Sequence, residues 1–187
     1  MRPISRGGKA AIVWFTGLSG AGKSTLAVAL QRELSRRGRP TLVLDGDALR
    51  TGLNADLGFS AADRTENVRR VAHVARLIAE CGVVAISALI SPSRADRLRA
   101  RQIAEEGGMR FIEVYLSTPL DVCEARDPKG LYVLARSGAI TEFTGISSPF
   151  EPSRRADLVI DTSKVSIEEA LTLLLGQVIS TPHECAA

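Results

Sequence analysis

A glycine-rich segment that ends in lysine and serine is the part of this sequence best suited to bind phosphate. Residues 17–24 read Gly-Leu-Ser-Gly-Ala-Gly-Lys-Ser, which fits the pattern G-x-x-x-x-G-K-S. In such a loop the glycines let the backbone approach phosphate, the Lys23 ammonium reaches the β- and γ-phosphates, and the Ser24 hydroxyl ligates Mg²⁺. We therefore predict that a nucleoside triphosphate is bound by Gly17, Leu18, Ser19, Gly20, Ala21, Gly22, Lys23, Ser24 and Thr25.

The residues on either side of this segment predict the local structure that such a loop needs. Residues 11–16 are a short run typical of a β-strand, and residues 23–37 place Leu26, Leu30 and Leu34 at helical spacing. A loop between a strand and a helix points its backbone N–H groups and the helix N-terminus at one anionic site. This context makes a chance glycine-rich turn the weaker interpretation.

Two aspartates after the next apolar run indicate the kind of P-loop protein. The run at 41–44 leads into Asp45-Gly46-Asp47 directly after the first predicted helix. In small P-loop kinases the second strand leads to the acceptor site, so we predict that Asp47 orients or deprotonates an acceptor hydroxyl and helps to hold Mg²⁺. The alternative for either aspartate is an N-cap of the following helix. The sequence has no Asn-Lys-x-Asp motif, which excludes a guanine-reading GTPase.

Several strings downstream of the glycine-rich segment resemble the adenylyl-sulfate kinase (APS kinase) family, in the family's order. The resemblance implies transfer of the ATP γ-phosphoryl group to the 3′-hydroxyl of adenosine 5′-phosphosulfate. The products would be ADP and 3′-phosphoadenosine 5′-phosphosulfate, the activated form of sulfate. The matching strings are residues 44–50, 52–60, 63–70, 90–92, 126–132 and 143–146.

The resemblance also implies an acceptor site. Because the acceptor is an anion, arginines and stacking aromatic rings are chemically suitable there. Phe59 and Phe143 would sandwich the adenine, and the alternative for either is a core anchor. A single helix face cannot aim Arg64, Arg69 and Arg70 at one ligand, so at least one of them is expected to face solvent. The implied acceptor residues are Asp47, Arg50, Phe59, Arg64, Asn67, Ile90, Ser91, Lys129 and Phe143.

Ser91 is predicted to be catalytic, together with Lys23 and Asp47. The family describes a serine in this Ile-Ser-Pro setting as a phosphorylated intermediate. Phosphoryl transfer depends on positioning and charge more than on a covalent relay, and no neighbouring histidine is available to activate the hydroxyl. We predict that Ser91 contacts the acceptor while direct in-line transfer dominates. The alternative is that its hydroxyl caps the helix predicted at 93–106.

The elements that must position these residues alternate between strands and helices. This pattern predicts an α/β fold with one P-loop kinase domain over 1–187, in which helices cover both faces of a parallel sheet. Asp63 with Glu66, and Ser166 with Glu169, are predicted to begin two of the helices as capping boxes. Further strands are predicted at 83–90, 111–116 and 157–161, and further helices at 63–80, 93–106, 119–126 and 166–179.

The one long segment without clear periodicity is predicted to contain a mobile lid at about 127–152. A lid would exclude water, so that ATP is not hydrolysed instead of the acceptor being phosphorylated. Lys129 and Arg136 would bring charge to the transferring group when the lid closes. The lid departs from the family at three positions. Val133 and Leu134 stand where lysines are usual in the family, and Ser147 stands where an aspartate is common.

Composition excludes several classes of protein. The net charge of +3 gives no argument for nucleic acid as a partner. The longest nearly apolar run, 83–90, is far shorter than the roughly 18 residues that span a bilayer, so no membrane segment is expected. Cys81, Cys123 and Cys185 are odd in number and widely spaced, which predicts neither a zinc site nor a disulfide framework and favours the cytoplasm. Residues 181–187 are expected to be a loose tail.

Two other functions stay open at this point. One is a kinase of the same fold that acts on a nucleotide, gluconate or an antibiotic hydroxyl, although such a kinase would lack the strings described above. The other is a non-catalytic ATP-binding module in a sulfate-assimilation complex, against which the intact Lys23, Ser24 and Asp47 argue. The family resemblance implies a homodimer and leaves open whether the protein works free or bound to a sulfate adenylyltransferase.

Overall fold

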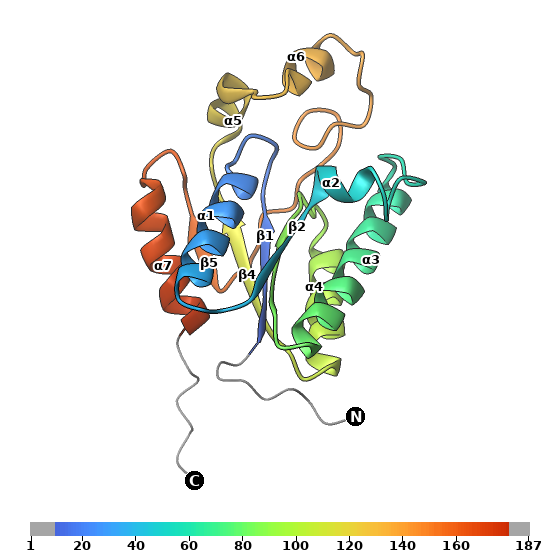
Figure 1. Ribbon diagram of the computed structural model, residues 1–187. Helices are drawn as coiled ribbons and strands as arrows, with labels where there is room; N and C mark the ends of the chain where they lie inside the picture. The colour runs from blue at the N-terminus through green and yellow to red at the C-terminus, as the bar shows by residue number, and fades with distance from the viewer. Residues whose placement is uncertain (1–9, 180–187) are drawn as a thin grey trace.

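The computed structural model describes residues 10–179 and places a parallel five-stranded sheet between two layers of helices (Figure 1). The strand order is β2-β3-β1-β4-β5, which confirms the predicted α/β P-loop architecture. The predicted tail at 181–187 lies outside the described residues. The strands are β1 (Ala11–Thr16), β2 (Thr41–Asp45), β3 (Val84–Ala88), β4 (Arg110–Leu116) and β5 (Leu158–Ile160). The helices are α1 (Lys23–Arg36), α2 (Gly46–Arg50), α3 (Ala61–Glu80), α4 (Arg94–Glu106), α5 (Leu120–Arg126), α6 (Leu131–Arg136) and α7 (Ile167–Ile179).

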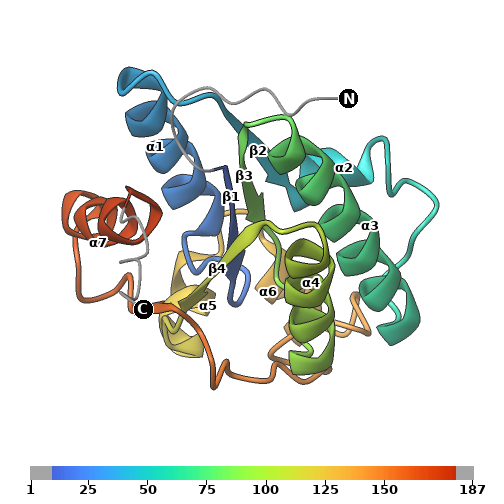
Figure 2. The same cartoon turned by 90° about the horizontal axis from the view of Figure 1, so that it is seen from below.

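The central strand β1 is buried on both faces, and its alternating side chains divide the core in two. Val13 and Phe15 pack into the core beneath α1 and α7, whereas Ile12 and Trp14 pack into the core beneath α3 and α4. The two helical layers are seen on opposite sides of the sheet in Figure 2. Because successive side chains of a strand point to opposite faces, a continuous apolar run is what a strand between two helical layers requires. Among the described residues no helix has both the length and the apolar character to cross a bilayer.

The helix starts agree with the predictions at α7 and differ at α3. At α7, Ser166 and Glu169 exchange hydrogen bonds as a capping box. At α3 the predicted pair of Asp63 with Glu66 is wrong, because Ser60 is the N-cap and its hydroxyl accepts from the Asp63 N–H at 3.1 Å. The helix therefore begins near Ala61, where the serine supplies the cap that the prediction had placed three residues later.

The segment at 127–152, predicted to be a lid without regular structure, contains the short helix α6. Tyr132 on this helix and Phe143 are buried and meet edge to face, with 4.9 Å between ring centroids. Asp127 begins the segment and accepts hydrogen bonds from the N–H groups of Tyr132 and Val133. Six residues are too short for a helical period to be read from the sequence, which is why α6 was missed.

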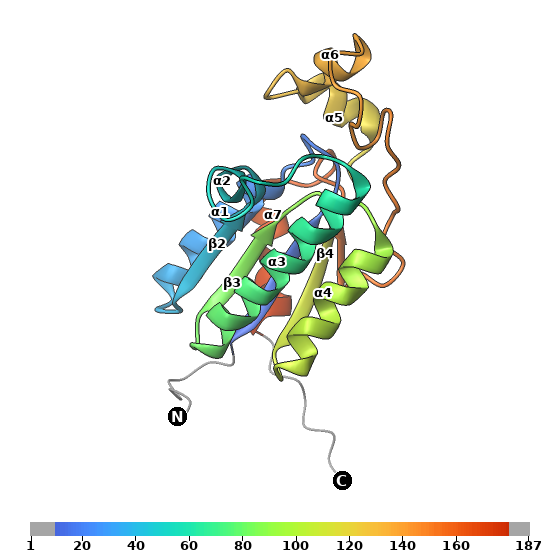
Figure 3. The same cartoon turned by 90° about the vertical axis from the view of Figure 1, so that its right-hand side faces the viewer.

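The carboxyl ends of the parallel strands all meet at one edge of the sheet. The loops that leave this edge carry the glycine-rich segment after β1, Asp45 and Asp47 after β2, and Ser91 after β3. The segment with α5 and α6 lies above the same edge (Figure 3). Ligands bind at this edge in open α/β sheets, so the fold brings the predicted phosphate, acceptor and lid residues to one place.

The two cysteines that the structure describes differ in exposure, and we expect them to differ in reactivity. Cys123 is buried against the glycine-rich loop, and burial raises the pKa of its thiol, whereas Cys81 is exposed. Since the thiolate is the nucleophile, Cys81 should be alkylated by iodoacetamide at pH 8 at least about tenfold faster than Cys123. Peptide mapping by mass spectrometry over time measures both rates, and unfolding in urea should equalise them. Equal rates in the native protein would contradict this burial.

Candidate active site

A cavity of about 1060 Å³ opens at the carboxyl edge of the sheet. The glycine-rich loop, the start of α2, the end of β3, the first turns of α3 and the segment at 126–144 line it. It brings together the predicted catalytic residues and every predicted acceptor residue, namely Lys23, Asp47, Arg50, Phe59, Arg64, Asn67, Ile90, Ser91, Lys129 and Phe143. Of the predicted ATP-binding residues, Ser19, Gly20, Gly22, Ser24 and Thr25 also line it, whereas Gly17, Leu18 and Ala21 do not.

The glycine-rich loop has the backbone conformation that its glycines permit. Gly22 has a φ of 93° directly before α1, and a Cβ at Gly20 would lie 2.8 Å from the carbonyl oxygen of Cys123. Lys23 bends back over the loop, and its Nζ donates to the carbonyl oxygens of Gly17 at 3.0 Å and Leu18 at 2.6 Å. Desolvation of the ammonium lowers the pKa of Lys23 to about 8. Phosphate beside Nζ would favour the charged form again, so this lysine is suited to an anionic ligand.

The hydroxyl of Ser24 faces a carboxylate, but it is not the one predicted. Ser24 Oγ donates to Oδ2 of Asp45 at 2.6 Å, while Oδ1 of Asp45 accepts from the N–H of Asp47 as the N-cap of α2. Asp45 is thus the N-cap of α2, which was the alternative interpretation for either aspartate, and it is also a neighbour of Ser24. The carboxylate of Asp47, which was predicted to help hold the metal, instead accepts from the Lys129 ammonium at the start of the lid.

The acceptor side of the cavity carries two arginines around one exposed phenylalanine. The guanidinium of Arg50 lies 4.2 Å from the ring centroid of Phe59, and that of Arg64 lies 5.9 Å from it. Arg50 donates to the carbonyl oxygens of Leu57 and Gly58, so its side chain is held in place. Burial lowers the pKa of both arginines, and for Arg64 the positive charge of Arg50 lowers it further. Two cations that repel each other at a cavity wall favour an anionic ligand.

Arg64 also connects α3 to the segment predicted to be the lid. Its guanidinium donates to Oγ1 of Thr144 at 2.7 Å and to the carbonyl oxygen of Glu142. Further along α3, Arg69 pairs with Glu66, and neither Arg69 nor Arg70 lines the cavity. The prediction that at least one of these three arginines faces solvent is confirmed, because the Arg69 side chain is exposed.

Two of the predicted acceptor residues have partners that the sequence did not reveal. Asn67 lies 8% exposed in the cavity wall, and its Oδ1 accepts from Nδ2 of the fully buried Asn54 at 2.8 Å. This bond leaves the amide N–H₂ of Asn67 as the group available to a ligand. Phe143 is 8% exposed and packs on Tyr132, so it serves as a core anchor while it lines the cavity.

Ser91 is buried and has an unusual backbone conformation, with a φ of 44°. Its Oγ accepts from Nε1 of Trp14 at 3.1 Å, and its carbonyl oxygen accepts from Oγ1 of Thr16. The alternative that Ser91 caps the next helix is wrong, because Ser93 is the N-cap of α4. The Ser91 hydroxyl keeps its own hydrogen for donation, since the indole occupies only an acceptor position.

Three further contacts at the cavity were missed or misjudged. Arg126 on α5 donates to the carbonyl oxygen of Gly20 and to Thr162, which ties α5 to the glycine-rich loop and to the loop after β5. Tyr132 donates its hydroxyl to the carbonyl oxygen of Ser19 at 3.0 Å. Arg136, which was expected to bring charge to the transferring group, pairs with Glu124 and does not line the cavity. The Arg-Asp-Pro string that begins at Arg126 was part of the family resemblance. The sequence could not show the partners of Arg126, because Gly20 and Thr162 lie far from it in the chain.

Comparisons with known proteins agree on one family. The family model described as adenylylsulphate kinase matches residues 9–161. An adenylyl-sulfate kinase of Paraburkholderia xenovorans is 55% identical over 172 residues, which cover 92% of this chain and 94% of that protein. An adenylyl-sulfate kinase of Shewanella denitrificans is 59% identical over 165 residues, covering 88% of this chain and 80% of that protein.

A solved structure agrees with the sequence relatives. The Mycobacterium tuberculosis APS kinase in complex with AMPPNP and APS superimposes with a TM-score of 0.90 at 48% identity, and the match covers 93% of this chain and 100% of that chain. The glycine-rich loop, the two arginines beside Phe59 and these matches over most of the chain lead to the same assignment. This chain belongs to the adenylylsulphate kinase family.

Proposed function

We propose that this protein is an adenylyl-sulfate kinase, which transfers the γ-phosphoryl group of ATP to the 3′-hydroxyl of adenosine 5′-phosphosulfate. The products are ADP and 3′-phosphoadenosine 5′-phosphosulfate, so the reaction activates sulfate. The observation that carries this proposal is that one cavity joins an intact phosphate-binding loop to an acceptor wall of two arginines and an exposed aromatic ring. A protein that only binds ATP would not need the cavity wall with two arginines and an aromatic ring.

On the donor side, the glycine-rich loop and Lys23 hold the ATP phosphates. The ammonium is placed to neutralise charge that develops between the β- and γ-phosphates as that bond breaks. In this structure the Lys23 ammonium is bonded to two carbonyl oxygens of its own loop, so binding of ATP exchanges those neutral partners for phosphate oxygens. Arg126, which already bonds to Gly20, keeps the loop in position during this exchange.

Magnesium fits the residues beside Ser24. The donors there are the Ser24 hydroxyl and the carboxylate of Asp45, and Asp47 lines the same cavity. Hydroxyl and carboxylate oxygens are the hard ligands that Mg²⁺ prefers. The described residues contain no cluster of three or more His, Cys, Asp or Glu that could hold a metal ion. Mg²⁺ is commonly bound by one or two carboxylates together with substrate phosphates. We propose that Ser24 and Asp45 hold it, with Asp47 nearby. When bound, the ion would offset negative charge on the transferring phosphoryl group.

On the acceptor side, Asp47 is the group that orients or deprotonates the 3′-hydroxyl. It is exposed in the cavity and carries its carboxylate at the start of α2, opposite Lys129. Arg50 and Arg64 bind the phosphosulfate or its adenosine through charge and hydrogen bonds, and Phe59 offers a face for the adenine ring. Asn67 donates through the amide that Asn54 orients. Direct in-line transfer from ATP then needs no covalent intermediate.

The segment at 127–152 acts as the lid over this cavity. Tyr132 anchors it to the loop at Ser19, Arg64 holds it at Thr144, and Lys129 reaches across to Asp47. These three contacts join the lid to the donor loop, the acceptor wall and the proposed general base. Closure over both substrates would exclude water and protect ATP from hydrolysis.

A coupled assay tests the proposed function directly. With ATP and adenylyl sulfate we expect ADP release and formation of 3′-phosphoadenosine 5′-phosphosulfate, which chromatography separates from the substrate. Parallel reactions with AMP and with gluconate serve as controls for the alternative kinases. Phosphorylation of either control in preference to adenylyl sulfate would refute the proposal, and binding of ATP without turnover of any acceptor would favour a non-catalytic module.

Replacement of Ser91 by alanine separates direct transfer from a covalent route. The variant is expected to remain active, with the KM for adenylyl sulfate raised about two- to tenfold, because one hydrogen bond to the acceptor is lost. Within residues 10–179 the only hydrogen bond to Ser91 Oγ comes from Trp14, so no base is placed to activate the hydroxyl. Steady-state kinetics measure the change. Complete inactivity, together with radiolabelled phosphate trapped on Ser91 during turnover, would support the covalent route instead.

The assembly and location of the protein are proposals that rest on the family and on its cysteines. We propose a homodimer, to be checked by light scattering after size-exclusion chromatography. Copurification with a sulfate adenylyltransferase would show whether the two enzymes associate. The described cysteines, Cys81 and Cys123, are both unpaired, which supports a reducing compartment such as the cytoplasm.

A further inference from the structure

A buried arginine lies behind the acceptor wall, outside the cavity itself. Arg97 on α4 is 2% exposed and is not among the residues that line the cavity. Its Nε donates to Oε1 of Glu113 on β4 at 3.1 Å, and both side chains of this ion pair are almost fully buried. The desolvated setting lowers the pKa of Arg97, which shows that burial of this charge is costly.

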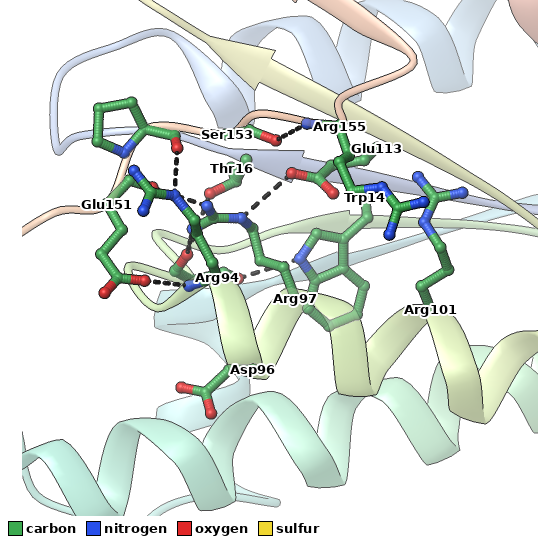
Figure 4. Close-up of polar contacts among 12 residues, drawn as sticks. Trp14, Thr16, Arg94, Asp96, Arg97, Arg101, Glu113, Glu151, Ser153 and Arg155 are labelled. Carbon is green, nitrogen blue, oxygen red and sulfur yellow. Dashed lines mark hydrogen bonds and ion pairs between the residues drawn. The ribbon is translucent and has the colours of Figure 1, made fainter.

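The other nitrogens of the guanidinium bind two main-chain oxygens from segments far apart in sequence. Nη1 donates to the carbonyl oxygen of Ser91 at 2.6 Å, and Nη2 donates to that of Glu151 at 2.7 Å. Figure 4 shows Arg97 together with Glu113 and Glu151. The N–H of Glu151 in turn donates to the carbonyl oxygen of Pro92. One side chain thus joins the end of β3, the interior of β4 and the last residues of the lid.

Stability alone does not account for a buried charge at this place. Buried ion pairs can often be replaced by apolar side chains of similar volume without loss of stability. An apolar pair, however, cannot donate hydrogen bonds to the carbonyl oxygens of Ser91 and Glu151. The Glu151 oxygen belongs to the end of the lid. The Ser91 oxygen belongs to the loop that presents Ile90 and Ser91 to the cavity, where Ser91 adopts a φ of 44° that a residue other than glycine takes up only when its surroundings impose it.

We propose that Arg97, held by Glu113, is a positioning residue for the acceptor half of the active site. It fixes the Ser91 peptide in its left-handed conformation, which sets where Ile90 and Ser91 meet the acceptor. The same guanidinium fixes Glu151 at the end of the lid. This assignment deepens the proposed function and rests on it, because it concerns the acceptor of that reaction. It gives Arg97 no contact with the substrate.

The sequence contains one tryptophan, and it reports on this arrangement. Trp14 is fully buried, and its indole N–H donates to Ser91 Oγ. If the Ser91 peptide leaves its conformation, this hydrogen bond is lost and the environment of the indole changes. The fluorescence of Trp14 therefore measures the position of Ser91 without any substrate present.

Two variants test the role of Arg97. The double variant Arg97→Met with Glu113→Leu removes the buried charges together, so it is expected to fold with a Tm close to that of the wild type. The single variant Arg97→Lys keeps the charge beside Glu113, but one ammonium cannot occupy the positions of three guanidinium nitrogens. For both we expect the KM for adenylyl sulfate to rise about tenfold or more while the KM for ATP stays within about twofold. The emission of Trp14 should shift in both without ligand.

The matched control is Arg99→Gln on the same helix. Arg99 is exposed and pairs with Glu106, and within the described residues it has no contact with Ser91 or Trp14. We expect both KM values and the Trp14 emission to remain at wild-type levels in this variant. If the arginines of α4 only stabilise the helix, the KM values and the Trp14 emission should change in the control as they do in the Arg97 variants. That result would count against a specific role for Arg97.

The outcomes distinguish the proposal from the function on which it rests. A folded double variant with unchanged KM values and unchanged Trp14 emission would overturn the role of Arg97, and equal rises in both KM values would also do so. If the double variant does not fold, the KM values and the Trp14 emission of Arg97→Lys test the role of Arg97 instead. If the wild type does not turn over adenylyl sulfate, the proposed function fails, and the Trp14 emission of the variants still decides whether Arg97 positions Ser91.

Discussion

Replacement of Lys23 by alanine is expected to lower kcat by about a thousandfold or more while the fold stays intact. The ammonium supplies positive charge where the β–γ phosphate bond breaks, and a preorganised charge of this kind stabilises a transition state by several kcal/mol. The fold should tolerate the change, because the ammonium bonds to two carbonyl oxygens of its own loop and desolvation lowers the pKa of Lys23, so we expect its charge to add little stability to the fold. Thermal unfolding should give a Tm equal to or above that of the wild type.

The matched control for this variant is Lys164→Ala. Lys164 is exposed, pairs with Asp161 and does not line the cavity. Single-turnover kinetics with ATP and adenylyl sulfate measure the chemical step in both variants. A Lys23→Ala enzyme with nearly wild-type turnover would show that the glycine-rich loop is not the donor site, whereas loss of turnover in Lys164→Ala would indicate a general effect of removing lysines.

Replacement of Arg64 by alanine should weaken binding of adenylyl sulfate about ten- to a hundredfold and leave ATP affinity within about twofold. A charge-assisted hydrogen bond contributes about 1.5–3 kcal/mol, which corresponds to this range. The structure adds a second reason, because Arg64 also bonds to Thr144 and Glu142 and so joins the acceptor wall to the lid. Arg50→Ala is expected to have the same selectivity, since its guanidinium lies over Phe59 on the same wall.

Isothermal titration with each substrate separately measures this selectivity. The control is Arg69→Ala, which removes an arginine from the next turns of α3 where it pairs only with Glu66 in the described structure. That variant should bind both substrates like the wild type. Equal losses for ATP and adenylyl sulfate in Arg64→Ala would mean that donor and acceptor do not occupy separate halves of the cavity.

The order and type of the main elements could be predicted because each carries a local signal. The apolar run of β1, the leucine spacing of α1 and the capping pair at Ser166 depend on residues close together in sequence. The start of α3 was misplaced because Ser60 and Asp63 each suit an N-cap, and only the folded structure selects one. The helix α6 is stabilised by the burial of Tyr132, which depends on tertiary packing.

The sequence predicted which residues line the candidate site better than it predicted which of them contact each other. The family resemblance named nine residues for the acceptor site from short strings, and all nine line the cavity. The sequence could not show that Asp45 meets Ser24 while Asp47 meets Lys129, because these contacts join segments separated by many residues. The role of Arg97 was beyond the sequence for the same reason, since an arginine in a polar helix gives no sign that it is buried.

The central place of β1 in the sheet has a consequence for synthesis of the chain. β1 is made first, yet its sheet partners are β3, at 84–88, and β4, at 110–116. At ribosomal speeds of about 5–20 residues per second, this strand, which is fully buried in the folded protein, waits roughly 5–20 s for both neighbours. The phosphate-binding loop cannot take its final shape before then. Nascent chains shorter than about 116 residues should therefore recruit chaperones and fail to bind ATP, and translation pauses before β4 should increase aggregation.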